Sequence, residues 1–96
     1  MQFSRELRDP VAAGKVTVSF RLWKRPQVKV GGRYRVGSTE ILIDDIELVP
    51  FHAITAADVR RAGERDLQAL AKRAAHAGPV AHDTLLYRVQ FHVADR

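Results

Sequence analysis

The feature that most constrains the fold is a strict alternation of side chains that begins at Val16. Apolar side chains recur there at every second position: Val16, Val18, Phe20 and Leu22. The residues between them are polar or amphipathic: Thr17, Ser19, Arg21 and Trp23. Because successive side chains of a β-strand point to opposite faces, the pattern predicts a strand over 16–23 with one face on the core. Pro26 cannot donate to a ladder, so the strand ends before it.

Three further segments have the pattern of strands. The segment 85–93 alternates in the same way and predicts the last strand. The segments 33–36 and 40–49 predict two more strands, joined by a turn at Gly37 and Ser38. The run Ile41-Leu42-Ile43 lacks alternation, which indicates a segment covered on both sides.

Capping residues predict the helices. Asp9 as a cap, Pro10 at a first helical position and Gly14 at a left-handed exit indicate a short helix near the start. A pair of helices precedes the last strand, one capped by Thr55 and one by Asp66. The order of helix, strands, helix pair and strand predicts a single α+β domain over 1–96, with a curled and largely antiparallel sheet.

The whole chain has a net charge of +5, and its positive charge is concentrated in the first third. Residues 1–36 contain nine basic side chains and only two acidic ones, Glu6 and Asp9. A one-sided positive field attracts polyanions and speeds their encounter with the protein. Nucleic acid is therefore a candidate partner, and a solvated basic surface that maintains solubility is the alternative.

Several classes of protein are disfavoured by the composition. Cysteine is absent, which removes disulfides, thiolate metal ligands and cysteine nucleophiles. No apolar run approaches the roughly 20 residues of a membrane span, and the charged segment 1–10 does not resemble a signal peptide. No phosphate-binding loop or dinucleotide fingerprint occurs. We therefore expect a cytoplasmic protein without a cofactor or a metal. The four histidines show no spacing typical of metal ligands: His52, His76, His82 and His92.

Three segments, in this order, resemble the ASCH family of the PUA-like superfamily. The first is 13–21 (AGKVTVSFR), similar to the glycine, lysine, threonine and arginine signature of that family. The second is 28–36 (VKVGGRYRV), similar to its basic, glycine-containing segment before a short strand. The third is 54–70 followed by the closing strand 87–91. Together they span nearly the whole chain, and the resemblance implies a PUA-like small curled β-barrel.

The resemblance also implies a function. ASCH domains are thought to bind RNA in a cleft between the barrel and its helices, and some small bacterial members are amidohydrolases on acetylcytidine nucleosides or cleave RNA. In the hydrolases a lysine, a hydroxyl residue and a glutamate form the site, which implies Lys15, Ser19 and Glu64 as catalytic residues here. Val16 occupies the position of the family's lysine, and Gly63 occupies that of its glutamate. The alternative for Lys15 is an exposed position at the start of a strand.

Arg21 is a candidate ligand-binding residue on the polar face of the first strand. Its planar guanidinium suits a phosphate or the face of a base, and Thr17 on the same face supplies a hydroxyl group. The alternative for Arg21 is a salt bridge to an acidic residue of a neighbouring strand: Asp44, Asp45 or Glu47.

Trp23 combines an aromatic ring with the adjacent cations Lys24 and Arg25. This pairing is typical of proteins that stack the bases of single-stranded nucleic acid. Tyr34, which lies between two arginines, has the same potential. For both aromatic residues the alternative is a place in the core or at one end of the barrel.

The main functional hypothesis is a binding module for RNA or a nucleotide that acts as a monomer. It requires the side chains at the odd positions of 15–23 to project into one ligand cavity. The alternatives are an amidohydrolase on acetylcytidine-type nucleosides, a ribonuclease, and a protein-interaction domain that uses the segment 58–65 to bind an acidic partner.

Overall fold

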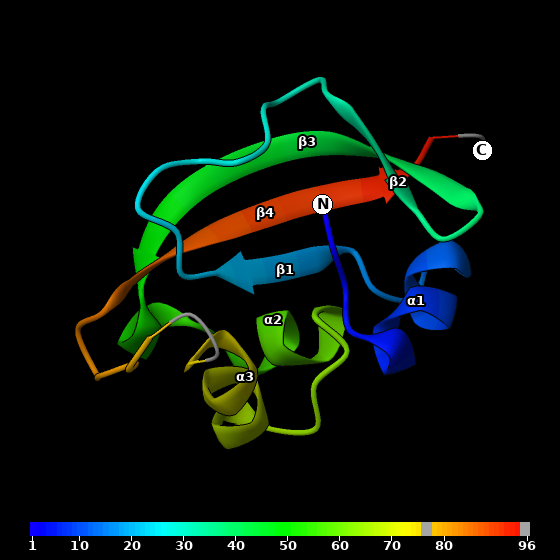
Figure 1. The fold of residues 1–96 in the computed structure, drawn as a ribbon. Helices are drawn as coiled ribbons and strands as arrows, with labels where there is room; N and C mark the ends of the chain where they lie inside the picture. The colour runs from blue at the N-terminus through cyan, green and yellow to red at the C-terminus, as the bar shows by residue number, and fades with distance from the viewer. Residues whose placement is uncertain (76–77, 95–96) are drawn as a thin grey trace.

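The structure is a computed structural model that describes residues 1–75 and 78–94, and it is drawn in Figure 1. These residues form a sheet flanked by short helices. None of the helices in the described ranges is long and apolar enough to cross a membrane. The elements follow the chain in the order α1 (Arg5–Ala12), β1 (Val18–Arg21), β2 (Arg33–Val36), β3 (Thr39–Pro50), η1 (Phe51–Ala53), α2 (Ala56–Arg61), α3 (Leu67–Ala74) and β4 (Leu85–Val93).

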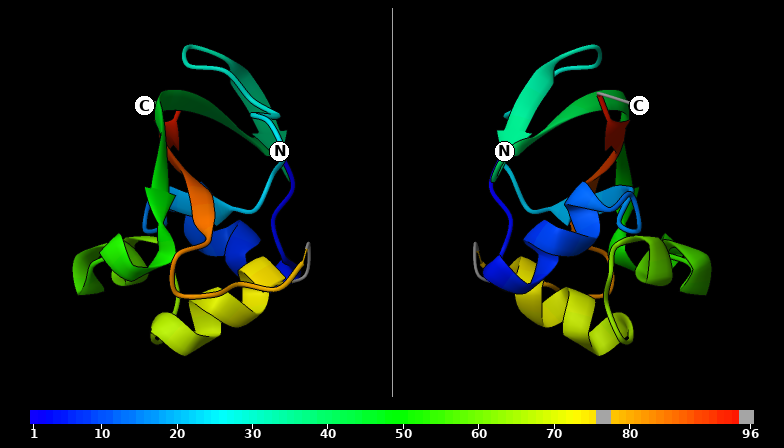
Figure 2. Two further views of the ribbon diagram at one scale, coloured as in Figure 1. Left: turned by 90° about the vertical axis from the view of Figure 1, so that its left-hand side faces the viewer. Right: turned by 90° about the vertical axis from the view of Figure 1, so that its right-hand side faces the viewer.

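The strands form one antiparallel sheet in the order β1-β4-β3-β2. The long strands β3 and β4 curl strongly, as the end views in Figure 2 show. The prediction of an α+β fold with a curled antiparallel sheet is therefore confirmed. The expected barrel, however, does not close, because β1 and β2 are the two edge strands and have no ladder between them. The segment 22–32 joins these two edge strands. It contains Pro26, which has no N–H to donate to a strand ladder.

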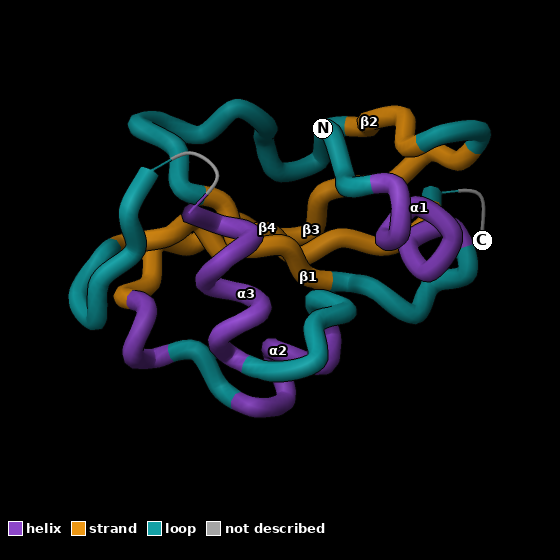
Figure 3. Tube along the Cα trace, turned by 60° about the horizontal axis from the view of Figure 1, so that its bottom comes forward, coloured by secondary structure: helices purple, strands orange, loops and turns teal. Residues whose placement is uncertain are grey.

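The core consists of two clusters on opposite faces of the sheet. We call the face of β1 and β4 that carries Ser19 and Val89 the inner face, and the other the outer face. Leu7 and Val11 of α1 join the inner cluster. The outer cluster contains Phe20 and the apolar side chains of α2 and α3. Figure 3 shows these two helices together on one side, with α1 apart at the far end.

The alternation predicted for 16–23 is confirmed only over β1, which is shorter than the predicted strand. Val18 and Phe20 are buried in the outer cluster, and Ser19 and Arg21, which alternate with them, are half-buried. Val16, before the strand, is buried in the inner cluster instead. The polar side chains do not face bulk water, because they lie on the inner face of a curled sheet. They are therefore positioned at the edge of the inner cluster.

The helix pair begins where its capping residues predict. The hydroxyl of Thr55 accepts from the backbone N–H of Asp58 at 3.1 Å, and the carboxylate of Asp66 accepts from that of Ala69 at 2.8 Å. Gly63 ends α2 with a φ of 77°. Both predicted caps are thus confirmed.

The start of the first helix was wrongly predicted. Helix α1 begins at Arg5 rather than near Asp9, so Pro10 lies inside it. Ser4, a residue type favoured at caps, occupies the cap position, although its side chain makes no hydrogen bond to the helix. The left-handed exit at Gly14 is confirmed, with a φ of 78°. Packing of Leu7 and Val11 on the inner cluster stabilises the helix despite the proline.

The run Ile41-Leu42-Ile43 in β3, which was predicted to be covered on both faces, is fully covered on one face only. Ile41 and Ile43 are buried in the inner cluster, whereas Leu42 is half-buried. The register between β3 and β4 shifts at Asp44, so the ladder resumes with Asp45 opposite Gln90. This bulge lets β3 bend around the inner cluster.

Candidate functional site

A cavity of about 540 Å³ opens between β1, α3 and residues 2–4, which we call the N-terminal segment. Part of its lining is apolar and includes Phe3, Leu7 and Phe20. The polar atoms of the wall come from these three elements, and they include several cations and hydroxyls: Gln2, Ser4, Ser19, Arg21, Lys72 and Arg73. We call this space the cationic cavity.

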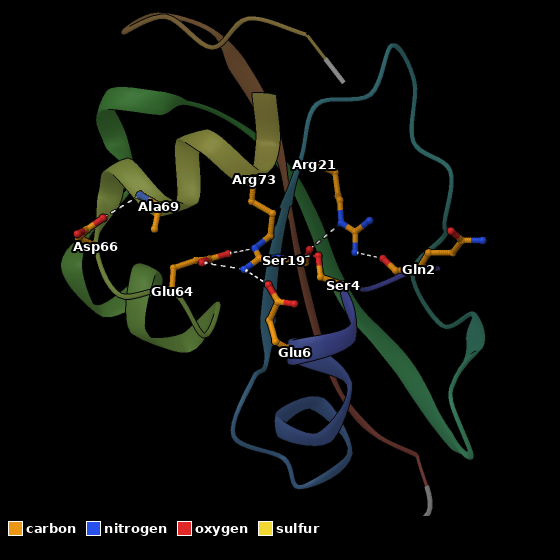
Figure 4. Close-up of polar contacts among 9 residues, drawn as sticks. All are labelled: Gln2, Ser4, Glu6, Ser19, Arg21, Glu64, Asp66, Ala69 and Arg73. Carbon is orange, nitrogen blue, oxygen red and sulfur yellow. Dashed lines mark hydrogen bonds and ion pairs between the residues drawn. The ribbon is translucent and has the colours of Figure 1, made fainter. Parts of the chain in front are cut away.

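Arg21 lies within the cationic cavity and is held there by two hydrogen bonds (Figure 4). Its Nε donates to the hydroxyl of Ser19 at 2.7 Å, and its Nη2 donates to the backbone carbonyl of Gln2 at 2.5 Å. The guanidinium carbon is 4.9 Å from the ring centroid of Phe3 and 5.9 Å from that of Trp23. The group is thus oriented by β1 and by the N-terminal segment.

The charge of Arg21 is not neutralised by a carboxylate among the residues that the structure describes. The alternative of an ion pair with Asp44, Asp45 or Glu47 is therefore not observed. Burial lowers the pKa of Arg21 to about 10, which leaves the group cationic at neutral pH. A partly buried cation without a counterion attracts an anion strongly.

Arg73 on α3 has the opposite environment. Its guanidinium donates twice to Glu64, from Nε by a very short bond and from Nη2 at 3.4 Å. It also donates to the hydroxyl of Ser4 at 2.5 Å and to Glu6 at 3.1 Å (Figure 4). The hydrogen bond that Arg73 donates to Glu64 raises the pKa of Arg73. Arg73 therefore ties the N-terminal segment to α3 and is a neutralised cation.

Ser19 and Glu64, two of the predicted catalytic residues, line a smaller adjoining cavity of about 30 Å³. The Glu64 side chain is only 7% exposed. Lys15, the third, is exposed and lines neither cavity. The lysine that does line the larger cavity is Lys72 of α3.

The predicted ligand-binding residues are distributed over two regions. Trp23 lines the cationic cavity beside Arg21, and its ring centroid lies 6.1 Å from that of Tyr87. Lys24 and Arg25 are exposed in the segment that follows and line neither cavity.

Thr17 and Tyr34 have structural partners elsewhere. The hydroxyl of Thr17 accepts from Nε of Arg61 at 3.1 Å, which joins the residue before β1 to α2. The hydroxyl of Tyr34 accepts from the backbone N–H of Lys29 at 3.0 Å, and its ring packs on the inner cluster. Of the odd positions in 15–23, only 19, 21 and 23 line the cationic cavity.

Gln2, Ser4, Lys72 and Arg73 were missed from sequence. Strand alternation identifies which residues of β1 face the cavity, but nothing in the sequence shows that the N-terminal segment crosses it. A signal did exist for Arg73, because it lies three residues after the buried Leu70 and thus on the same side of α3.

The described histidines lie away from the cationic cavity. The rings of His52 and His82 stack with their centroids 4.7 Å apart, and His92 Nδ1 lies 2.8 Å from Asp44. His76 lies outside the described residues. Within the described ranges, the acidic and histidine side chains form no cluster of three or more suited to a metal ion.

An open, curled antiparallel sheet with one helix at its end and a helix pair against its first strand defines a small domain of the ASCH/PUA-like fold. No protein-family model matches the chain, and no curated protein sequence matches it significantly. The structure is similar to that of an ASCH domain from Lactobacillus crispatus JV V101, with a TM-score of 0.72 and 15% sequence identity. That comparison covers 92% of this chain and 70% of the other.

A second solved structure has the same fold. It is a DUF984 protein from Enterococcus faecalis V583, with a TM-score of 0.68 and 16% identity, and the comparison covers 93% of this chain and 67% of that one. The ASCH resemblance of the sequence is thus confirmed at the level of the fold.

Proposed function

We propose that the domain binds RNA or a nucleotide through a phosphate group in the cationic cavity. The observation that supports this most directly is the environment of Arg21, a partly buried cation in a cavity without a carboxylate partner among the described residues. A phosphate would supply the missing counterion and accept hydrogen bonds from a planar donor group.

The hydrogen bonds of Arg21 leave part of its guanidinium available. Nε and Nη2 have protein acceptors, whereas the structure gives Nη1 none among the described residues. No solvent-inaccessible side-chain N or O atom in the described part of the chain lacks a partner, so Nη1 is accessible to solvent. Lys72, which is exposed at the rim, adds a second positive charge for a phosphate.

Trp23 supports a nucleotide rather than a simple inorganic anion. Its half-buried ring lines the same cavity and lies close to the guanidinium of Arg21. A base stacked on an aromatic side chain contributes about 1–3 kcal/mol of binding free energy. Phosphate on Arg21 and base on Trp23 would thus hold the two parts of one nucleotide.

Quenching of tryptophan emission by uridine monophosphate and by short single-stranded RNA tests this proposal, because Trp23 is the only tryptophan. We expect Arg21→Met to weaken binding by about tenfold or more, since a hydrogen bond to a charged group contributes about 1.5–3 kcal/mol. Arg35→Ala, which removes an exposed arginine of β2 outside the cavity, is the matched control. Equal affinities of the Arg21 variant and the wild type would exclude the proposal.

Hydrolysis of an acetylcytidine-type nucleoside, or cleavage of RNA, is a second candidate function. Its support is that Ser19 and Glu64 line one small cavity. Two observations oppose it: the Glu64 carboxylate already accepts hydrogen bonds from Arg73, and Lys15 lies outside the cavity. Chromatography of acetylcytidine after incubation with a high protein concentration tests the first reaction, and labelled RNA tests the second. Products that persist in a Ser19→Ala variant would show that this site does not produce them.

A further inference from the structure

The inner face of the sheet continues beyond the core as an exposed apolar surface. Leu48 on β3 is 48% exposed and Leu85 on β4 is 51% exposed. Leu85 lies two residues before Tyr87 on the same face of β4, and Leu48 lies opposite Tyr87 in the ladder. We call the surface formed by Tyr87, Leu48 and Leu85 the apolar shelf.

The apolar shelf is continuous with the cationic cavity. Arg21 lies opposite Tyr87 in the β1–β4 ladder, and Tyr87 lies opposite Leu48 in the β3–β4 ladder. The three residues therefore form one row across the sheet, about 10 Å long from Arg21 to Leu48 at the usual strand spacing. The Trp23 ring, which lines the cavity, lies 6.1 Å from the Tyr87 ring and is tilted by 38° to it.

We propose that the apolar shelf binds a second base of a single-stranded nucleic acid whose neighbouring nucleotide occupies the cationic cavity. This inference rests on the proposed function and extends it from one nucleotide to a short strand. A strand that follows the row places a phosphate at Arg21, one base on Trp23 and the adjacent base on Tyr87 and the two leucines.

The charge around the shelf favours nucleic acid over a protein partner. The exposed cations Lys24 and Arg25 directly follow Trp23, whose ring lies beside that of Tyr87. Glu47, which precedes Leu48 on β3, is paired with Arg88 at 3.4 Å, so the charge left near the shelf is the positive charge beside Trp23. An apolar surface with such a charge beside it suits a ligand with apolar base faces and an anionic backbone. The bases must be unstacked to lie on such a surface, which selects single strands over duplexes.

The test measures the affinities of wild type and of a Leu48→Ser/Leu85→Ser variant for two ligands, uridine monophosphate and tetrauridylate. The loss of affinity caused by the substitutions is then compared between the two ligands. Both leucines are exposed, so their replacement does not open the core. We expect the variant to lose about fivefold or more of its affinity for tetrauridylate, the loss typical of one stacked base, and much less for the monophosphate. Tyr87→Leu, which keeps an apolar side chain but removes the ring, should reduce tetrauridylate affinity in the same direction.

Leu67→Ser is the control, because Leu67 is an exposed leucine of α3 outside the inner face and lines neither cavity. Equal tetrauridylate affinities for wild type and the shelf variants would overturn the inference. If those affinities still depended on Arg21, the proposed function would stand. If neither ligand bound the wild type, both proposals would fail. A wild-type dimer in gel filtration that the double variant dissociates would also overturn the inference, because the shelf would then be covered by a second copy.

Discussion

Arg21 donates to Ser19, two residues earlier on the same strand, at a distance of 2.7 Å. This bond directs the guanidinium along the inner face of the sheet, and the bond to the Gln2 carbonyl fixes its far end. Both acceptors are uncharged, so the positive charge remains uncompensated within the described protein. The arrangement explains why the same side chain is costly for the fold and suited to an anionic ligand.

Replacement of Arg21 by methionine should stabilise the protein while it impairs binding. Burial lowers the pKa of Arg21 to about 10, so the folded state holds the proton less tightly than the unfolded state and the charge costs stability at neutral pH. We expect the free energy of unfolding of Arg21→Met to rise by about 1 kcal/mol, because an apolar side chain replaces an unpaired buried charge. Urea denaturation measures it, and a marked loss of stability would contradict this account.

Arg73→Met should destabilise the fold by about 2–4 kcal/mol, because it leaves the Glu64 carboxylate buried and unpaired. It also removes the bond to Ser4 that holds the N-terminal segment. The double variant Arg73→Met/Glu64→Gln should be more stable than the sum of the single changes predicts, since neither charge is then left alone. Strict additivity in urea denaturation would show that the pair is not coupled.

Asp58 should make the protein sensitive to acid. Burial acts to raise the pKa of Asp58, but the hydrogen bond and charge of Arg88, 2.9 Å away, outweigh it and hold the pKa below its ordinary value. Stability from this pair is complete above the ordinary pKa of about 4 and is lost as the pH falls through the lowered value.

We therefore expect Asp58→Asn to lower the free energy of unfolding by about 1–3 kcal/mol at pH 7 and to flatten its decline below pH 4. Asp83→Asn, at an exposed aspartate without an ion pair among the described residues, is the control. An unchanged acid profile in the Asp58 variant would refute the assignment.

Gly63→Ala should destabilise the protein more than Gly14→Ala. Both glycines have a left-handed backbone, with φ of 77° and 78°. A Cβ at Gly63 would lie 2.7 Å from Cγ2 of Val16 and 3.0 Å from Cδ2 of Leu7, whereas a Cβ at Gly14 meets nothing within 4 Å. We expect a cost of about 1 kcal/mol at Gly14 and about 2–3 kcal/mol at Gly63 in thermal unfolding. Equal costs would contradict this expectation, because they would show that the neighbours of Gly63 move aside without a loss of stability.

Much of the fold was predictable because local chemistry determines it. The alternation around Val18 set the faces of β1, and the side-chain oxygens of Thr55 and Asp66 marked the helix pair. The start of α1 was missed because Asp9 and Pro10 offered a stronger capping pattern than Ser4, whose hydroxyl accepts from Arg73 instead of capping the helix. Closure of the barrel depends on contacts between distant edges, which no local pattern records.

The candidate site was predictable only where it lies on one strand. Alternation placed Ser19, Arg21 and Trp23 on one face, and these three residues do line the cationic cavity. Lys72 could not be associated with them, because that association depends on how α3 packs across β1. Leu85 lies on the same face of β4 as Val89 but beyond the end of the inner cluster, where the alternation of the strand gives no sign that it is exposed.

The dependence of RNA affinity on salt concentration tests the central claim most directly. Each phosphate neutralised by a cation on a single strand contributes about −0.7 to the slope of log affinity against log salt. We predict a clearly negative slope for wild type with tetrauridylate, and a slope reduced in magnitude by about 0.7 for Arg21→Met. Identical slopes and affinities for the two proteins would contradict the assignment of Arg21 as the phosphate-binding residue.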